Sequence, residues 1–254
     1  MVGERQAVVS CHVERPLDDT VWTRFSALQR RRPGGFAIAA LMRPADAGAG
    51  EDEDRWLQRA REAAVHGPLG HHTHWTAPDH ARPSGAEPLA TDYKHPGERV
   101  RMEGARLREL GLSPVGFCGG GWYTDAEVAE VCAELGYVDC TPRATRPPYL
   151  PSGEAWASLQ QPARIRLPSG SLLPAIPTTH SLGDLARALR SRTLPPVVHA
   201  YFHDTDLLDR RRRALLPVLL RLLSRRARPV DLATLAAAIG HEAPEVDWAD
   251  VARL

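Results

Sequence analysis

Short apolar runs rich in β-branched residues alternate along the chain with segments in which apolar side chains recur at helical spacing. The predicted strands are residues 7–13, 36–42, a short segment running into 70–71, 114–117, 137–141, 172–179 and 197–202. The predicted helices are residues 17–31, 53–65, 98–110, 124–135, one beginning at 181–184, 209–226 and 231–239. This alternation of about seven strand–helix units is typical of an α/β fold around a largely parallel sheet. Because no composition break marks a linker, we expect a single domain over residues 1–254, ending in a tail at 240–254.

Several helix ends carry local signals. Thr124 and Glu127 have the spacing of a capping box, and Gly136 follows the end of the same helix. Gly111 is suited to a left-handed cap after the preceding helix, and Asp231 is suited to the start of the last one. Pro217 falls inside residues 209–226 and predicts a kink or a restart there.

Composition narrows the class of protein. The chain has 254 residues, of which 43% are apolar, so it has ample material for a packed core. Lys+Arg 32 against Asp+Glu 31 leaves a formal charge of +1, which excludes the broad basic field of a dedicated nucleic-acid binder. No leader-like start and no apolar run long enough for a membrane span is visible, so we expect a cytoplasmic protein. The 4 cysteines include no C-x-x-C pair and are expected to be free thiols.

Histidines follow three of the predicted strands. His12 and Glu14 end the first strand, the segment 70–74 (GHHTH) ends the third, and the segment 203–206 (HDTD) ends the last. In parallel α/β folds the reactive groups lie at the carboxyl ends of the strands. Side chains two residues apart on a strand share a face, so His12 lies with Glu14 and His72 lies with His74. Two imidazoles and a carboxylate suit zinc or a similar divalent ion with open positions for water and substrate, whereas the alternative is a pair of hydrogen-bonded loop histidines.

Four segments, in this order, resemble the motifs of the polysaccharide deacetylase (NodB-homology) family from residue 7 to about residue 239. They are AVVSCHVE (7–14), GHHTHWTAP (70–78), GFCGGGWYTDAEVAEVCAELGYVDCT (116–141) and HAYFHDTDLL (199–208). The resemblance implies a distorted (β/α) barrel that uses one divalent metal ion, with zinc as the expected ion, to hydrolyse an N-acetyl or O-acetyl group on a sugar. Glu14, His72 and His74 correspond to metal ligands, His12 to the general base and His203 to the general acid.

Two positions depart from the family pattern. His12 stands where the family usually has the base aspartate, and Cys118 stands where an arginine often orients that aspartate. A neutral imidazole needs no guanidinium beside it, so the joint loss of both charges is electrostatically coherent. The pair permits an active enzyme with a histidine base, and it equally permits a protein that has lost catalysis. His12 as a fourth metal ligand, and Cys118 as a soft ligand, a nucleophile or an ordinary buried thiol, also stay open.

Further residues have weaker assignments. Trp122 and Tyr123 are candidates for stacking on a sugar, with core packing as the alternative, and Cys118 is grouped with them at the substrate side. Asp204 and Asp206 either hold His203 in its charged form or cap a helix. His71, His80 and His180 are candidates to hydrogen bond to the metal ligands without touching the ion, or to lie at the surface. Four further histidines are expected to be structural: His66, His95, His199 and His241.

These observations predict a metal-dependent hydrolase that removes an acetyl group from an amino sugar or a glycosylated small molecule in the cytoplasm. The alternative from a different class is a carbohydrate-binding protein that keeps the fold without catalysis. A metallohydrolase barrel of the amidohydrolase type also uses an H-x-H pair, but it usually places that pair on its first strand. The expected partner is a small molecule or carbohydrate, and the oligomeric state stays open.

Overall fold

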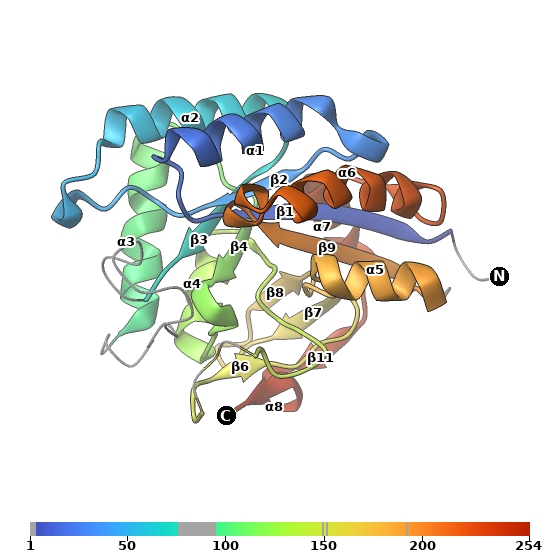
Figure 1. Ribbon diagram of the computed structural model, residues 1–254. Coiled ribbons are helices and arrows are strands. Elements are labelled where there is room, and N and C mark those ends of the chain that lie inside the picture. Colours follow the sequence, from blue (N-terminus) through green and yellow to red (C-terminus); the bar gives the residue numbers. More distant parts are fainter. Residues whose placement is uncertain (1–3, 76–94, 149, 151, 192) are drawn as a thin grey trace.

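The computed structural model describes residues 4–75, 95–148, 150, 152–191 and 193–254, which form a mostly parallel β-sheet covered by helices (Figure 1). The strands are β1 (Gln6–Val13), β2 (Ala39–Met42), β3 (Leu69–Thr73), β4 (Gly116–Gly119), β5 (Val138–Asp139), β6 (Trp156–Ala157), β7 (Ala163–Arg166), β8 (Leu172–Ala175), β9 (Val197–His203), β10 (Arg228–Pro229), β11 (Glu245–Asp247) and β12 (Ala252–Arg253). The helices are α1 (Asp19–Arg31), α2 (Glu53–His66), α3 (Pro96–Glu109), α4 (Ala126–Glu134), α5 (Leu182–Ser191), α6 (Arg210–Ser224), α7 (Leu232–Glu242) and α8 (Trp248–Val251). The predicted α/β class is confirmed. No helix within the described ranges is both long and apolar enough to cross a membrane.

The strands of the main sheet follow the order β9–β1–β2–β3–β4–β5–β8–β7–β11, with β10 beside the start of β1. Among the described strands of this sheet, the pairings are parallel except that of β7 with β8. Beyond β8 the chain reaches β9, where His180 forms a single parallel bridge with Ala200. A regular barrel would join these two sides of the curved sheet by a full ladder of hydrogen bonds. Here a single bridge connects them.

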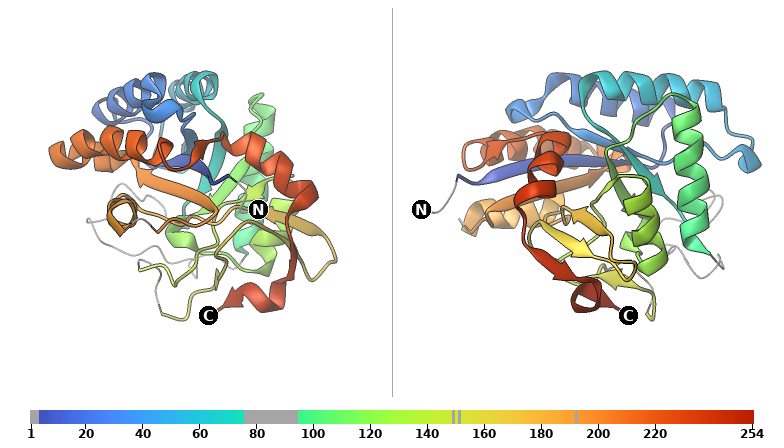
Figure 2. Two further views of the ribbon diagram at one scale, coloured as in Figure 1. Left: turned by 90° about the vertical axis from the view of Figure 1, so that its right-hand side faces the viewer. Right: turned by 180° about the vertical axis from the view of Figure 1, so that it is seen from behind.

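Side chains alternate strictly along β1. Ala7, Val9, Cys11 and Val13 pack against the helices, in a core cluster that includes residues of α1, α2, α5 and α6. Val8 faces the opposite way, into a second cluster that α7 helps to close. Figures 1 and 2 show α1, α2 and α6 over one face of the sheet, with α7 behind it. Because side chains on a strand alternate between its two faces, the polar residues Ser10 and His12 face the interior of the fold together with Val8.

Helix boundaries agree with most of the local signals. Gly111 and Gly136 have φ of 74° and 68°, the left-handed conformation expected after a helix, and the Asp231 side chain caps α7. The prediction of Thr124 as a helix cap is wrong, because the Asp125 carboxylate accepts the hydrogen bond that caps α4. Thr124 lies one residue too early, with its side chain buried.

The C-terminal half departs further from the predicted pattern. Strands β7 and β8 form an antiparallel pair inside the otherwise parallel sheet. Residues 240–254 were predicted to be a tail, but they contribute β11, which pairs with β7 at the edge of the sheet. They also form α8 and β12, and β12 pairs with β6. Helix α6 continues past Pro217 as one helix instead of restarting there. The α/β alternation therefore holds best for the first five strands, which carry most of the candidate site.

Candidate active site

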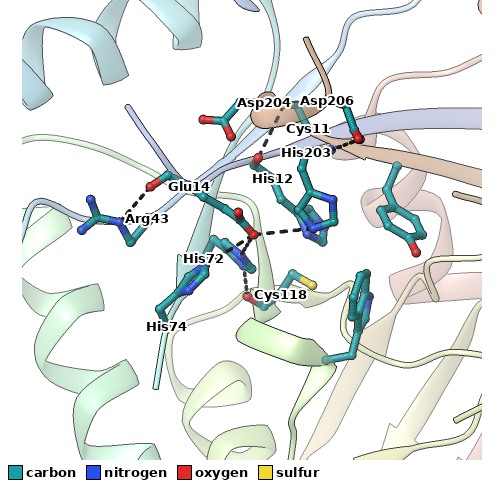
Figure 3. A network of polar contacts seen from close by, with 12 residues as sticks. Cys11, His12, Glu14, Arg43, His72, His74, Cys118, His203, Asp204 and Asp206 are labelled. Carbon is teal, nitrogen blue, oxygen red and sulfur yellow. Dashed lines mark hydrogen bonds and ion pairs between the residues drawn. The ribbon is translucent and has the colours of Figure 1, made fainter. Parts of the chain in front are cut away.

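The carboxyl ends of β1, β3 and β9 bring their histidines to one place (Figure 3). The register of β1 and β9 sets His12 beside His203, and the register of β3 and β4 sets His72 beside Cys118. The rings of His12 and His72 then meet with their centroids 4.7 Å apart, although β2 separates their two strands. The sequence predicted that these segments would share one edge of the sheet, and the structure confirms this placement.

The Glu14 carboxylate lies among three imidazoles. Its Oε1 atom is 3.9 Å from Nε2 of His72, 3.8 Å from Nε2 of His74 and 3.5 Å from Nε2 of His203. Oxygen and nitrogen ligands of one zinc ion lie about 2 Å from it, so two of them stand at most about 4 Å apart. The separations of Glu14 from His72 and His74 are longer than direct hydrogen bonds and match that spacing. The ligand atoms of Glu14, His72 and His74 all lie within 4.8 Å of one another.

His72 is oriented to present one nitrogen to this space. Its Nδ1 donates a hydrogen bond to the Cys118 carbonyl oxygen at 2.6 Å, which leaves the lone pair on Nε2. That Nε2 atom is buried and makes no hydrogen bond. A buried imidazole nitrogen that faces a carboxylate across about 4 Å is suited to share a cation with it. The residues present therefore fit a divalent metal ion.

Glu14 is held by contacts on its main chain. The Arg43 guanidinium donates from Nε to the Glu14 carbonyl oxygen at 3.0 Å, and the same side chain forms an ion pair with Glu51. Burial alone would raise the pKa of the Glu14 carboxyl, but the imidazoles of His203, His74 and His72 bring that pKa well below its usual range. Glu14 is therefore negatively charged at neutral pH, as a metal ligand must be.

His12 is almost completely buried, with only 2% of the residue exposed. Its ring stacks on Tyr201 at 5.5 Å and lies 5.6 Å from the Trp122 ring, and its Nε2 atom makes no hydrogen bond. Burial, together with the neighbouring imidazoles, holds the pKa of His12 well below its usual range. The ring is therefore neutral at physiological pH and has a lone pair to offer.

Cys118 is fully buried on the inner side of His72. Burial and the nearby Asp139 raise the pKa of the Cys118 thiol, while the Arg143 guanidinium opposes them. Since the Cys118 side chain is 0% exposed, it does not lie at the rim where a sugar would first make contact.

The two aromatic candidates lie in different surroundings. Trp122 faces the site from the interior, where its Nε1 donates to Thr178 Oγ1 at 2.9 Å. Its φ is 62°, a left-handed conformation that costs a non-glycine residue about 1–2 kcal/mol and that concentrates at functional sites. Tyr123 instead packs on Trp75 at 5.1 Å, in a different core cluster from Trp122. Of the two rings, Trp122 alone contacts a candidate catalytic side chain.

His71 and His180 belong to neither group of potential metal ligands among the described residues. The His71 ring lies on the opposite face of β3, where it pairs with Glu103 at 2.8 Å. His180 bonds through Nδ1 to Thr179 Oγ1 at 2.8 Å, beside the bridge to β9. His80, together with most of the proline-rich loop that contains it, lies outside the described residues.

Asp204 and Asp206 bind backbone groups around the site. Asp206 accepts a hydrogen bond from the His203 backbone N–H at 3.0 Å, at the start of the 3₁₀ helix Asp204–Leu208. Asp204 accepts from the Arg15 backbone N–H at 2.9 Å, and burial raises the pKa of its carboxyl to about 7. The Asp206 contact belongs to a capping box, as the capping alternative expects, whereas Asp204 binds the backbone of Arg15 outside that helix.

Sequence reasoning missed Arg143 and Tyr201, which lie next to the Trp122 ring. The Arg143 guanidinium lies 4.5 Å over the Trp122 ring and donates to the Tyr201 hydroxyl at 2.7 Å. Tyr201 could have been found from strand periodicity, since it lies two residues before His203 and so shares its face. Arg143 follows β5 after a short irregular segment, and no spacing rule connects it to the histidines.

His199 is buried in the interior of β9 and should make stability depend on pH. Ser10 donates to its Nε2 at 2.8 Å, its Nδ1 donates to the Ile176 carbonyl oxygen at 3.2 Å, and burial lowers the pKa of the ring to about 4. The unfolded chain binds this proton below about pH 6.5, whereas the folded chain binds it only below about pH 4. The contribution of His199 to stability is therefore full above about pH 6.5, and it is lost by up to about 1.4 kcal/mol per pH unit as the pH falls toward 4.

We expect the free energy of unfolding of His199→Gln to depend less on pH between about 6.5 and 4 than that of the wild type. Urea unfolding of the wild type and the variant, measured from about pH 7 to about pH 4.5, gives the two slopes. Parallel profiles would show that the ring is protonated equally in both states, contrary to its neutral hydrogen-bonding pattern.

Neither a protein-family model nor a curated protein matches the sequence. Among solved structures, a 4-alpha-glucanotransferase from Thermococcus litoralis is similar with TM-score 0.55 and 11% identity, over 95% of this chain and 40% of that one. The chain thus spans well under half the length of that enzyme. A family 4 carbohydrate esterase from Streptomyces lividans in complex with acetate has TM-score 0.49 and 11% identity, over 87% of this chain and 88% of that chain. A putative polysaccharide deacetylase involved in O-antigen biosynthesis from Bordetella bronchiseptica has TM-score 0.43 and 14% identity, over 92% and 91%. At these identities the likeness to the glucanotransferase shows a shared α/β fold and no activity.

Proposed function

We propose that the protein is a metal-dependent hydrolase that removes an acyl group, acetyl above all, from an amino sugar or a glycosylated small molecule, with small cytoplasmic glycosides as its substrates. One observation carries the proposal: the Glu14 carboxylate oxygen faces the Nε2 atoms of His72, His74 and His203 at 3.5–3.9 Å. These side chains come from three separate strand ends that also carry the deacetylase-like motifs.

Glu14, His72 and His74 would hold the ion. When bound, a divalent ion supplies Lewis acidity that activates a water molecule and polarises the acyl carbonyl group. Two imidazoles and one carboxylate would suit such an ion, as in catalytic zinc sites. The Glu14 side chain is 27% exposed, so substrate can approach the metal ligands from this side.

His12 and His203 would move the protons. In the proposed reaction, neutral His12 accepts a proton from the attacking water, and the water oxygen forms the new bond to the acyl carbon. The bond from that carbon to the sugar nitrogen then breaks, and His203 donates a proton to the leaving amine. The two rings are neighbours in an edge-to-face arrangement, with their centroids 5.1 Å apart, so both could reach the same acyl group.

A carbohydrate-binding protein without catalysis is the second candidate. Burial lowers the pKa of His12, and a ring of low pKa is a weak base. This alternative keeps the fold and the pocket and predicts sugar binding without turnover.

Metal content and acetate release test the proposal together. We expect the purified protein to retain about one divalent ion per chain, measured by elemental mass spectrometry, and to release acetate from one or more N-acetylated sugars in a panel of monosaccharides and glycosides. Chelation should stop the release, and the readdition of zinc should restore it. A folded protein that binds no divalent ion would contradict both the metal site and the reaction.

A further inference from the structure

A second set of potential metal ligands lies deeper in the same pocket. The ligand atoms of His12, His72 and Cys118 all lie within 4.8 Å of one another. His12 and Cys118 are at most 2% exposed, and the Nε2 atoms of His12 and His72 make no hydrogen bond. In Figure 3 His12 and Cys118 lie on one side of His72, and His74 lies on the other. The pocket thus has an inner set (His12, His72 and Cys118) and an outer set (Glu14, His72 and His74).

The two sets cannot be filled at the same time. His72 belongs to both, and its Nδ1 atom already donates to the Cys118 carbonyl oxygen. A neutral imidazole with a proton on Nδ1 has one lone pair, on Nε2, and so binds one ion. An ion in the pocket therefore takes either the outer or the inner ligands.

The two sets differ in chemical hardness. The outer set includes a carboxylate, which suits harder and borderline ions, whereas the inner set includes a thiol, whose thiolate form prefers soft ions.

We propose that the inner set of His12, His72 and Cys118 binds a soft divalent ion, for which Cd²⁺ is the probe, in competition with the ion of the outer set. Binding converts the Cys118 thiol to a thiolate and releases its proton to solvent. The ion is then bound by the lone pair of His12. If the proposed function holds, His12 can no longer accept a proton from water, so the soft ion inhibits the hydrolase instead of activating it.

X-ray absorption of the full-length wild-type protein loaded with one equivalent of Cd²⁺ tests the site without any substitution. We expect one sulfur ligand with nitrogen ligands around cadmium, and nitrogen and oxygen ligands only when the same protein carries Zn²⁺. A thiolate-to-cadmium charge-transfer band in the ultraviolet should appear on titration.

The variants Cys118→Ser and Cys140→Ser form a matched pair, because both thiols are fully buried on adjoining strand ends and only Cys118 belongs to the inner set. Cys118→Ser should lose the charge-transfer band and weaken Cd²⁺ binding at least about tenfold, whereas Cys140→Ser should keep both. Circular dichroism and thermal unfolding establish that each variant folds.

The outcomes separate this inference from the proposed function. Cadmium with only nitrogen and oxygen ligands in the wild type would overturn the inner set and leave the deacetylase proposal intact. A sulfur ligand that persists in Cys118→Ser would also overturn it. A cadmium–sulfur ligand in a protein that never releases acetate would support the inner set while contradicting the function.

Discussion

Replacing Glu14 with glutamine is expected to remove both metal retention and acetate release. Glutamine keeps the shape of the side chain, and the Arg43 contact survives because it is made to the main-chain oxygen of residue 14. The substitution removes the negative charge that faces three imidazoles at 3.5–3.9 Å. Loss of a partner that merely orients a metal ligand costs about 10–100-fold in affinity, so loss of the charged ligand itself should cost at least that much.

Isothermal titration with Zn²⁺ and elemental analysis of the purified variant measure this loss. Glu53→Gln is the matched control, because Glu53 forms an ion pair with Arg106 at the start of α2 and belongs to neither set of potential metal ligands. It should bind zinc and release acetate as the wild type does. Retention of a full equivalent of tightly held zinc by Glu14→Gln would show that the ion is held elsewhere.

Replacing His203 with glutamine is expected to lower kcat by about 10²–10⁴-fold while leaving the metal in place. His203 lies outside the set of Glu14, His72 and His74, yet its Nε2 atom faces the same carboxylate oxygen at 3.5 Å. Glutamine can hydrogen bond to a leaving amine but has no proton of suitable acidity to transfer to it. The change should therefore appear in kcat, with KM and zinc content close to those of the wild type.

Steady-state acetate release and zinc content, measured on the same preparation, give this result. His241→Gln, at an exposed position of α7, serves as the control with unchanged turnover. Equal kcat in His203→Gln and the wild type would assign the proton donor to another group. Sugar binding by both proteins with turnover by neither would favour the carbohydrate-binding alternative.

The sequence predicted the part of the site that follows from strand periodicity. His12 and Glu14 share a face because they are two residues apart, and parallel strands bring their carboxyl ends to one edge. The structure shows both features, and it also shows the strand register that sets His12 beside His203. Register depends on which backbone groups meet across neighbouring strands, and spacing within a single strand carries no such information.

The residues that escaped prediction depend on contacts between distant segments. The Arg143 guanidinium lies over the Trp122 and Tyr201 rings, and nothing near residue 143 in the sequence indicates this contact. Tyr123 has the same local pattern as Trp122, but the turn through Gly121 and Trp122 at φ of 61° and 62° directs the two rings into different clusters. The antiparallel β7–β8 pair likewise has strands too short for their direction to be read from periodicity.

The position of β1 has a consequence for how quickly the site can form and disassemble. Ladders with β2 and β9 flank the strand on both sides, and His12 and Glu14 stand at its end. Amide protons in such a doubly paired, buried strand exchange with solvent only in rare, nearly global openings. The backbone that carries the ligands of β1 is therefore ordered before any ion binds. The free energy of ion binding is not reduced by the entropic cost of ordering a flexible segment. Ion exchange in this pocket should then be governed by the entry path past Glu14 rather than by rearrangement of the backbone.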